Sequence, residues 1–213
     1  MKIKVCGMRE PDNLKQLSAL DIDYVGFIFY SESRRFVTDE QMESLFAIPP
    51  LKIQKVGVFV NQGSKTIIDK CRRYMLPIVQ LHGNESVEEC LVLKEADLGV
   101  IKAFGIDESI DFSDMEPYAN AVDCFLFDTS SAKFGGTGTL FNWDILKNYP
   151  YDTPYFLSGG LSLENLQKVK AIKDERLIGL DLNSKFEILP GLKAISKLVQ
   201  AVETIRSIES EDL

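Results

Sequence analysis

CFLFDT, at residues 124–129, is an apolar run of strand length that ends in a carboxylate and a hydroxyl. Its apolar residues are continuous and do not alternate with polar ones, which is typical of a strand in a covered parallel sheet. Seven further runs share this length and character: IKVCG at 3–7, YVGFIFY at 24–30, KVGVFVN at 55–61, PIVQLHG at 77–83, GVIKAFG at 99–105, PYFLSGG at 154–160 and IGLDLNS at 178–184. The sequence therefore predicts eight parallel strands.

Segments with helical periodicity separate these runs. Thr38 and Gln41 form a capping-box pattern, Ser162 precedes another apolar stripe, and Pro190-Gly191 is expected to open the last helix. The expected helices, of which the fourth and fifth have the weakest pattern, are 12–20, 38–46, 85–96, 110–119, 142–148, 162–172 and 192–208.

Eight strand–helix units in 213 residues average about 25 residues each. This spacing favours the α/β class and a single closed (βα)8 barrel, the TIM barrel. The alternative is an open doubly wound sheet, but no GxGxxG follows the first strand. We expect one catalytic domain at residues 1–208 and a short, solvated acidic tail at 209–213.

The composition narrows the possible partners and location. The net charge is −8 and no basic run stands out, so nucleic acid and anionic membranes are not expected partners. No apolar stretch approaches the roughly 18 residues that span a bilayer, and the N-terminus does not resemble a signal peptide. The four cysteines have no CxxC spacing and His82 is the only histidine, so we expect reduced thiols, a cytoplasmic protein and no metal site.

The carboxyl ends of the first and sixth runs carry the main candidates for chemistry, since barrel active sites lie on the loops after the strands. Cys6 ends the first run, where Lys4 and other cations could lower the pKa of its thiol. Asp128 ends the sixth, where partial burial could raise the pKa of its carboxyl and suit it to general acid catalysis. The structural alternatives are a small buried apolar residue at Cys6 and a helix cap or ion pair at Asp128.

A glycine-rich loop, SSAKFGGTG at 130–138, follows Asp128. Gly135 and Gly136 could act as hinges of a lid, and Lys133 could reach an anionic substrate. The alternative is a plain flexible loop. Small-residue loops beside an acid are more often functional.

The seventh and eighth runs end in SGG at 158–160 and DLNS at 181–184. Backbone N–H groups and short polar side chains in these two loops bind phosphate in many barrels. A tight turn explains either loop alone equally well, but the two together favour a phosphate site. Its candidate residues are Gly159, Gly160, Asp181, Asn183 and Ser184.

Arg34 and Arg35 follow the second run, and His82 ends the fourth. Arginine binds carboxylates through two parallel hydrogen bonds, so one of the pair could hold a substrate carboxylate, while the alternative is two solvated charges. His82 could transfer protons, but ordering of the pocket by hydrogen bonding is the favoured reading.

Several of these motifs occur together in one family. The chain resembles the phosphoribosylanthranilate isomerases, (βα)8 barrels that perform an Amadori rearrangement in tryptophan biosynthesis. The matching stretches, which span almost the whole chain in order, are KVCGM at 4–8, YVGFIFYSESRRFV at 24–37, VGVFVN at 56–61, VQLHG at 79–83, LFDTSSAKFGGTG at 126–138, FLSGGL at 156–161 and GLDLNSKFEILPGLK at 179–193.

The resemblance implies a cofactor-free isomerase that acts on a small phosphorylated substrate, N-(5-phosphoribosyl)anthranilate. The family's general base falls on Cys6, its general acid on Asp128, and its carboxylate-binding arginine most naturally on Arg35. The chain departs from the common pattern at Lys185, where many members have glycine, and at Ala194, where many have an acidic residue. The oligomeric state is left open between monomer and homodimer.

Three other functions are alternatives to this one. A histidine-pathway isomerase would have an aspartate in place of Cys6. Indole-glycerol-phosphate synthase would need a lysine acid and a longer N-terminal extension. A non-catalytic phosphate-binding barrel would have no need for both Cys6 and Asp128.

Overall fold

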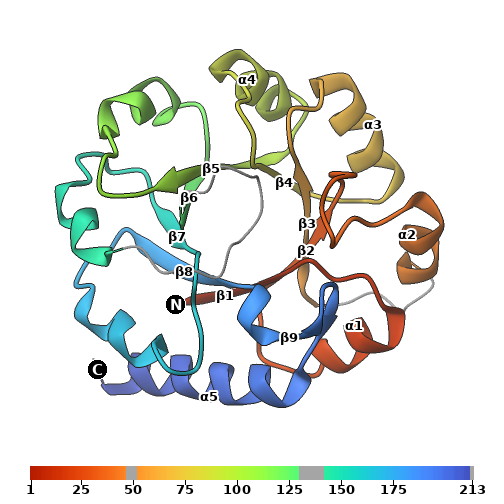
Figure 1. Ribbon diagram of the computed structural model, residues 1–213. Coiled ribbons are helices and arrows are strands. Elements are labelled where there is room, and N and C mark those ends of the chain that lie inside the picture. The colour runs from red at the N-terminus through yellow and green to blue at the C-terminus, as the bar shows by residue number, and fades with distance from the viewer. Residues whose placement is uncertain (47–51, 130–141, 212–213) are drawn as a thin grey trace.

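The computed structural model of the chain describes residues 1–46, 52–129 and 142–211. Eight parallel strands close into one barrel in chain order, which confirms the predicted fold (Figure 1). Every predicted strand is present, with ends shifted by a few residues. The strands are β1 Lys2–Cys6, β2 Tyr24–Ile28, β3 Gln54–Phe59, β4 Ile78–Leu81, β5 Gly99–Ile106, β6 Cys124–Thr129, β7 Tyr155–Leu157 and β8 Leu177–Leu182.

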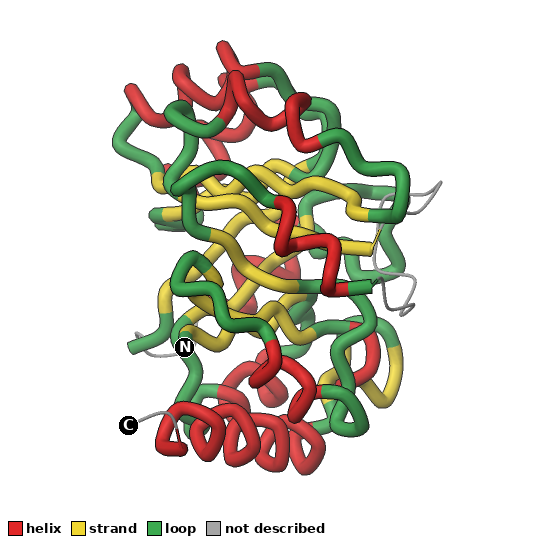
Figure 2. Tube along the Cα trace, turned by 90° about the vertical axis from the view of Figure 1, so that its left-hand side faces the viewer, coloured by secondary structure: helices red, strands yellow, loops and turns green. Residues whose placement is uncertain are grey.

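Helices surround the barrel on the outside (Figures 1 and 2). The capping box predicted at Thr38 and Gln41 is confirmed, since each backbone N–H donates to the other side chain, at 3.0 and 3.2 Å. Helix α3 was not anticipated from the sequence. The α-helices are α1 Pro11–Leu17, α2 Asp39–Phe46, α3 Ser64–Arg73, α4 Val87–Glu95 and α5 Ile195–Glu211. Within the described residues, four segments are 3-10 helices: η1 Phe112–Tyr118, η2 Trp143–Asn148, η3 Leu166–Ala171 and η4 Ser184–Phe186.

Two predicted helix starts are wrong. Ser162 begins a turn, and the 3-10 helix η3 starts only at Leu166. Pro190-Gly191 forms the turn of a hairpin between β9 (Glu187–Leu189) and β10 (Leu192–Lys193), and α5 begins at Ile195. Gly191 has a φ of +89°, a left-handed conformation typical of turns, so the same residues that can precede a helix here reverse the chain. At the other end, α5 continues to Glu211 and so includes part of the predicted acidic tail.

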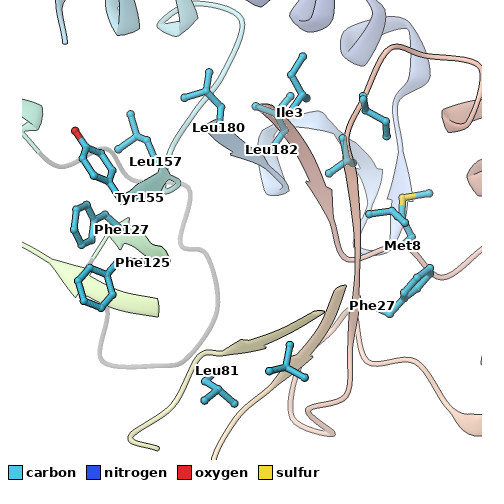
Figure 3. Close-up of a cluster of buried hydrophobic side chains, with 14 of the residues drawn as sticks. Ile3, Met8, Phe27, Leu81, Phe125, Phe127, Tyr155, Leu157, Leu180 and Leu182 are labelled. Atoms are coloured by element: carbon cyan, nitrogen blue, oxygen red, sulfur yellow. The ribbon is translucent and has the colours of Figure 1, made fainter. Parts of the chain in front are cut away.

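The strands carry apolar side chains outward and the site residues inward. Phe125 and Phe127 belong to the large buried cluster between the strands and the helices, and Figure 3 shows both pointing away from the barrel interior. Cys124 and Leu126 belong to a separate cluster inside the barrel. Because strand side chains alternate between faces, Asp128 continues the inner series into the barrel mouth.

Strand β1 follows the same rule. Ile3 and Val5 belong to the outer cluster, so Lys4 and Cys6 project inward. Each fully buried apolar side chain of that cluster contributes roughly 1.5–3 kcal/mol to folding, which lets the barrel hold polar residues inside. The closing register pairs Lys4 with Asp181 of β8.

Candidate active site

One cavity at the carboxyl ends of the strands, of about 700 Å³ including its open mouth, collects the predicted residues. Every predicted site residue within the described part of the chain lines it: Cys6, Arg35, His82, Asp128, Gly159, Gly160, Asp181, Asn183 and Ser184. The remaining three, Lys133, Gly135 and Gly136, lie outside the described residues. The cavity also contains residues that sequence reasoning missed, including Tyr30, Ser33, Gln80 and Ser158.

Cys6 is buried at the end of β1, with only 3% of its surface exposed. Gly26 of β2 lies opposite, and a Cβ there would come within 2.6 Å of the Cys6 Sγ, so only glycine leaves room for the thiol. Burial raises the pKa of the Cys6 thiol above its ordinary value, although the charges of Lys4 and Lys193 oppose this. The predicted cations are present and lower this pKa as expected, but burial has the larger effect and the net shift of the pKa is upward.

Lys4 and Asp181 form a buried ion pair beside this thiol. Lys4 Nζ lies 3.0 Å from Asp181 Oδ2, and the two side chains are 0% and 5% exposed. Burial raises the pKa of Asp181 above its ordinary value, although the charge of Lys4 and its hydrogen bond oppose this. Asp181 Oδ1 has no hydrogen-bond partner among the described residues, so this predicted substrate-binding residue still has a free acceptor.

Asp128 occupies the end of β6, across the mouth from Cys6. The Thr129 N–H donates to its Oδ1 at 2.8 Å, and His82 Nε2 lies 3.5 Å from its Oδ2. A Cβ on Gly159 would lie 2.8 Å from Oδ1, and Gly159 has a φ of +77°. Glycine is therefore required beside the carboxyl, both for space and for backbone conformation.

Arg35 lies at the rim of the cavity and is held by a carboxylate. Its Nε and Nη2 donate to both oxygens of Glu187 at 2.7–3.0 Å. Lys193 Nζ donates to the same carboxylate and to Asn183 Oδ1, each at 2.8 Å. Burial would raise the pKa of Glu187, but the hydrogen bonds from Arg35 and Lys193 and the charge of Lys193 hold this pKa below its ordinary value.

The structure distinguishes the two adjacent arginines. Arg34 is exposed and its carbonyl accepts a hydrogen bond from Arg9, whereas Arg35 lines the cavity. Gly7, with a φ of +82°, lies under Arg35, since a Cβ there would come within 2.7 Å of the Arg35 Cδ. Sequence reasoning missed Glu187 and Lys193. The signal that could have indicated them is their position as charged residues on either side of Pro190-Gly191.

The two predicted phosphate loops lie on the same side of the cavity. Gly159 and Gly160 both have positive φ, and the Gly160 carbonyl accepts from Asn165 Nδ2 at 2.8 Å. Of the two departures from the family pattern, Lys185 is exposed and does not line this cavity. Ala194 is buried, and its carbonyl accepts from Leu198 N–H at 3.1 Å in the first turn of α5.

Within the described ranges, no group of three or more His, Cys, Asp or Glu side chains is placed to hold a metal ion. In the same ranges, no helix has the length and apolar character that crossing a membrane requires.

A thiol, a carboxyl, a guanidinium and the two predicted phosphate loops around the mouth of a closed barrel define a (βα)8-barrel enzyme. Residues 3–204 match the sequence model of a family described as N-(5'phosphoribosyl)anthranilate (PRA) isomerase. The chain belongs to that family and is an isomerase of tryptophan biosynthesis.

The similarity covers nearly the whole chain. The N-(5'-phosphoribosyl)anthranilate isomerase of Parabacteroides distasonis is 45% identical over 209 residues, covering 96% of this chain and 93% of the relative. The phosphoribosyl anthranilate isomerase structure from Thermus thermophilus has a TM-score of 0.85 at 27% identity and covers 98% of this chain and 100% of the neighbour. An isomerase structure in complex with reduced 1-(o-carboxyphenylamino)-1-deoxyribulose 5-phosphate has a TM-score of 0.80 at 28% identity. The match covers 97% of this chain and 99% of the neighbour.

Proposed function

We propose that this enzyme converts N-(5-phospho-β-D-ribosyl)anthranilate into 1-(2-carboxyphenylamino)-1-deoxy-D-ribulose 5-phosphate, with Asp128 as general acid and Cys6 as general base. The observation that carries this assignment is the placement of the two groups. They project inward from the ends of β6 and β1, three strands apart around the closed barrel, and line one cavity. A sugar ring between them would present its ring oxygen to one group and its C2′ hydrogen to the other.

The first step opens the furanose ring. Protonated Asp128 donates its proton to the ring oxygen as the bond from that oxygen to C1′ breaks. The nitrogen lone pair forms a double bond to C1′, which gives a protonated Schiff base and leaves Asp128 as a carboxylate. The Thr129 N–H that donates to Oδ1 leaves Oδ2 as the oxygen that carries the proton.

The second step moves the hydrogen at C2′. Cys6, as a thiolate, removes the C2′ proton, and the electron pair of that bond forms the C1′–C2′ double bond while the iminium nitrogen is neutralised. The resulting enolamine tautomerises to the ketose: the C2′ hydroxyl loses its proton as its oxygen becomes the carbonyl, and a proton adds to C1′. Lys4 and Lys193 favour the thiolate that this step requires, against the opposing effect of burial.

Groups at the two ends of the cavity would hold the substrate. Arg35 would bind the anthranilate carboxylate, His82 would order the pocket, and the phosphate loops defined above would bind the phosphate. Lys133, Gly135 and Gly136 would form the lid predicted from the sequence. Orientation of the substrate by such binding groups can lower the activation barrier of the reaction by about 7–11 kcal/mol. The complex of a family neighbour with a reduced product analogue supports a ligand of this shape.

Anthranilate fluorescence provides the direct test. Purified enzyme is mixed with freshly prepared phosphoribosylanthranilate, and the fluorescence of the substrate is followed with time. We expect an enzyme-dependent decay with formation of the ketose, lost in the Cys6→Ala variant. A decay rate equal to that of the substrate alone would contradict the proposal. A cytoplasmic location, the absence of nucleic-acid partners and a monomeric or homodimeric state stay predictions.

A further inference from the structure

Gln80 lies beside His82 and has no role in the steps above. It projects into the barrel from β4, is only 1% exposed, and its amide Nε2 lies 2.8 Å from His82 Nδ1. An amide NH2 group can only donate, so Nδ1 must accept and the proton of the neutral imidazole is on Nε2. That ring nitrogen lies 3.5 Å from Asp128 Oδ2.

The orientation of the Gln80 amide decides this assignment. Its Oε1 is buried and has no hydrogen-bond partner among the described residues. The reversed amide would place an NH2 group there, with two unpaired donors. Buried unpaired donors are rarer than under-satisfied oxygens, so the observed orientation is favoured.

We propose that Gln80 is a positioning residue that holds His82 in the Nε2–H tautomer and directs this N–H at the carboxyl of Asp128. The inference rests on the proposed function, in which Asp128 loses its proton as the ring opens. Negative charge then develops on the carboxyl, so the His82 N–H binds it more strongly in the transition state than in the ground state. The other tautomer would point a lone pair at the forming carboxylate and oppose the step.

NMR spectroscopy can read this tautomer directly. His82 is the only histidine among the 213 residues, so the ring signals of the ¹⁵N-labelled protein need no assignment. At alkaline pH, where a histidine ring is neutral, we expect a protonated Nε2 and an unprotonated Nδ1. A wild-type ring protonated on Nδ1 would overturn the proposal, and this result does not depend on which reaction the enzyme catalyses.

Two variants connect the tautomer to catalysis. Gln80→Glu places against Nδ1 a carboxylate, and a carboxylate can only accept a hydrogen bond. We therefore expect the ring proton on Nδ1 and kcat reduced by about 10- to 100-fold. Binding of the reduced product analogue should change less than kcat does, because the His82 N–H binds Asp128 more strongly only as the ring opens. Gln80→Leu removes the amide without imposing a tautomer and should reduce kcat less, by about 3- to 10-fold.

Gln62 provides a matched control. Its Nε2 donates to the Phe29 carbonyl at 2.7 Å and its Oε1 is also buried and unpaired among the described residues, but it does not line the cavity. Gln62→Leu should leave both the His82 signals and kcat unchanged. A Gln80→Glu protein that switches the tautomer but keeps kcat within two-fold of wild type would overturn the proposal. If no form of the enzyme consumes phosphoribosylanthranilate, the proposed function fails while the tautomer assignment stands.

Discussion

The two proton-transfer groups have opposite surroundings on the two sides of the barrel mouth. Cys6 is enclosed by charges, namely the buried Lys4–Asp181 pair and Lys193. Asp128 instead lies beside His82, the backbone N–H of Thr129 and a glycine loop. A thiol that must become an anion needs nearby cations, whereas the buried charge that interacts with Asp128 is that of another carboxylate, Asp181. Substitutions on the two sides of the mouth test this difference.

Asp128→Asn should reduce kcat by about 10²- to 10⁴-fold, because the amide cannot donate the proton that opens the ring. Asparagine can keep the hydrogen bond from the Thr129 N–H to its side-chain oxygen, so the cavity should be preserved. Binding of the reduced product analogue, measured by titration calorimetry, should change by less than about three-fold. A kcat within ten-fold of wild type would assign the acid to another group.

Lys4→Met should affect both stability and the pH dependence of the reaction. It leaves Asp181 buried without its partner, so the free energy of unfolding should fall by about 3–5 kcal/mol in urea titrations. The pKa of Cys6 is already raised by burial, and loss of the opposing Lys4 charge should raise it further. Because the base is the thiolate, kcat/KM increases with pH, and this rise should move to higher pH in the variant.

The double variant Lys4→Met/Asp181→Leu is the control for stability, since removing both charges should restore much of the unfolding free energy. A rise of kcat/KM at the same pH in wild type and Lys4→Met would contradict the role of Lys4 in favouring the thiolate.

Glu187→Gln should weaken the grip of Arg35 and raise KM about ten-fold with little change in kcat, because the guanidinium loses the carboxylate that holds it. The pKa of Glu187 is lower in the folded protein than in the unfolded chain, so its charge stabilises the fold at neutral pH. This contribution is lost as the pH falls from the ordinary glutamate pKa through the lower pKa of Glu187 in the folded protein.

Unfolding of wild type and Glu187→Gln should therefore differ at pH 7 and converge in acid. Glu43→Gln, which breaks an exposed ion pair with Arg73, should change the unfolding free energy by less than about 1 kcal/mol at either pH. Equal effects of the two substitutions at pH 7 would contradict the account of Glu187.

Arg34→Ala should have the smallest effect, a change of less than about two-fold in KM, because this arginine is exposed outside the cavity. Arg35→Ala is the comparison, and it should raise KM by at least about ten-fold. A larger effect at Arg34 in the fluorescence assay would reverse the assignment of the carboxylate-binding residue.

Local patterns were sufficient to predict the barrel and both proton-transfer positions. Apolar runs of strand length marked every strand, and Cys6 and Asp128 are the inward residues at two strand ends. Gln80 could have been inferred too, since a residue two positions before His82 in a strand shares its face. The outer helix α3 was missed because most of its residues are polar or charged, with Ile67 and Cys71 as its buried residues.

Long-range electrostatics could not be predicted in this way. Arg35 and Glu187 are 152 positions apart, and only the closed barrel brings them together. The net direction of the shift in the pKa of Cys6 could not be predicted either. A sequence shows nearby charges but not the depth of burial, and here burial outweighs the charges. Pro190-Gly191 was misread because helix starts and tight turns use the same residues.

The central claim is that Cys6 removes the C2′ proton and that Asp128 opens the ring. Substrate deuterated at C2′ tests it most directly, through the primary isotope effect on kcat/KM in wild type, Cys6→Ser and Asp128→Asn. We predict that both variants are slower by orders of magnitude, that the isotope effect grows in Cys6→Ser because proton removal becomes limiting, and that it shrinks in Asp128→Asn because ring opening becomes limiting. A Cys6→Ser enzyme with near-wild-type turnover, or with an unchanged isotope effect, would contradict the account.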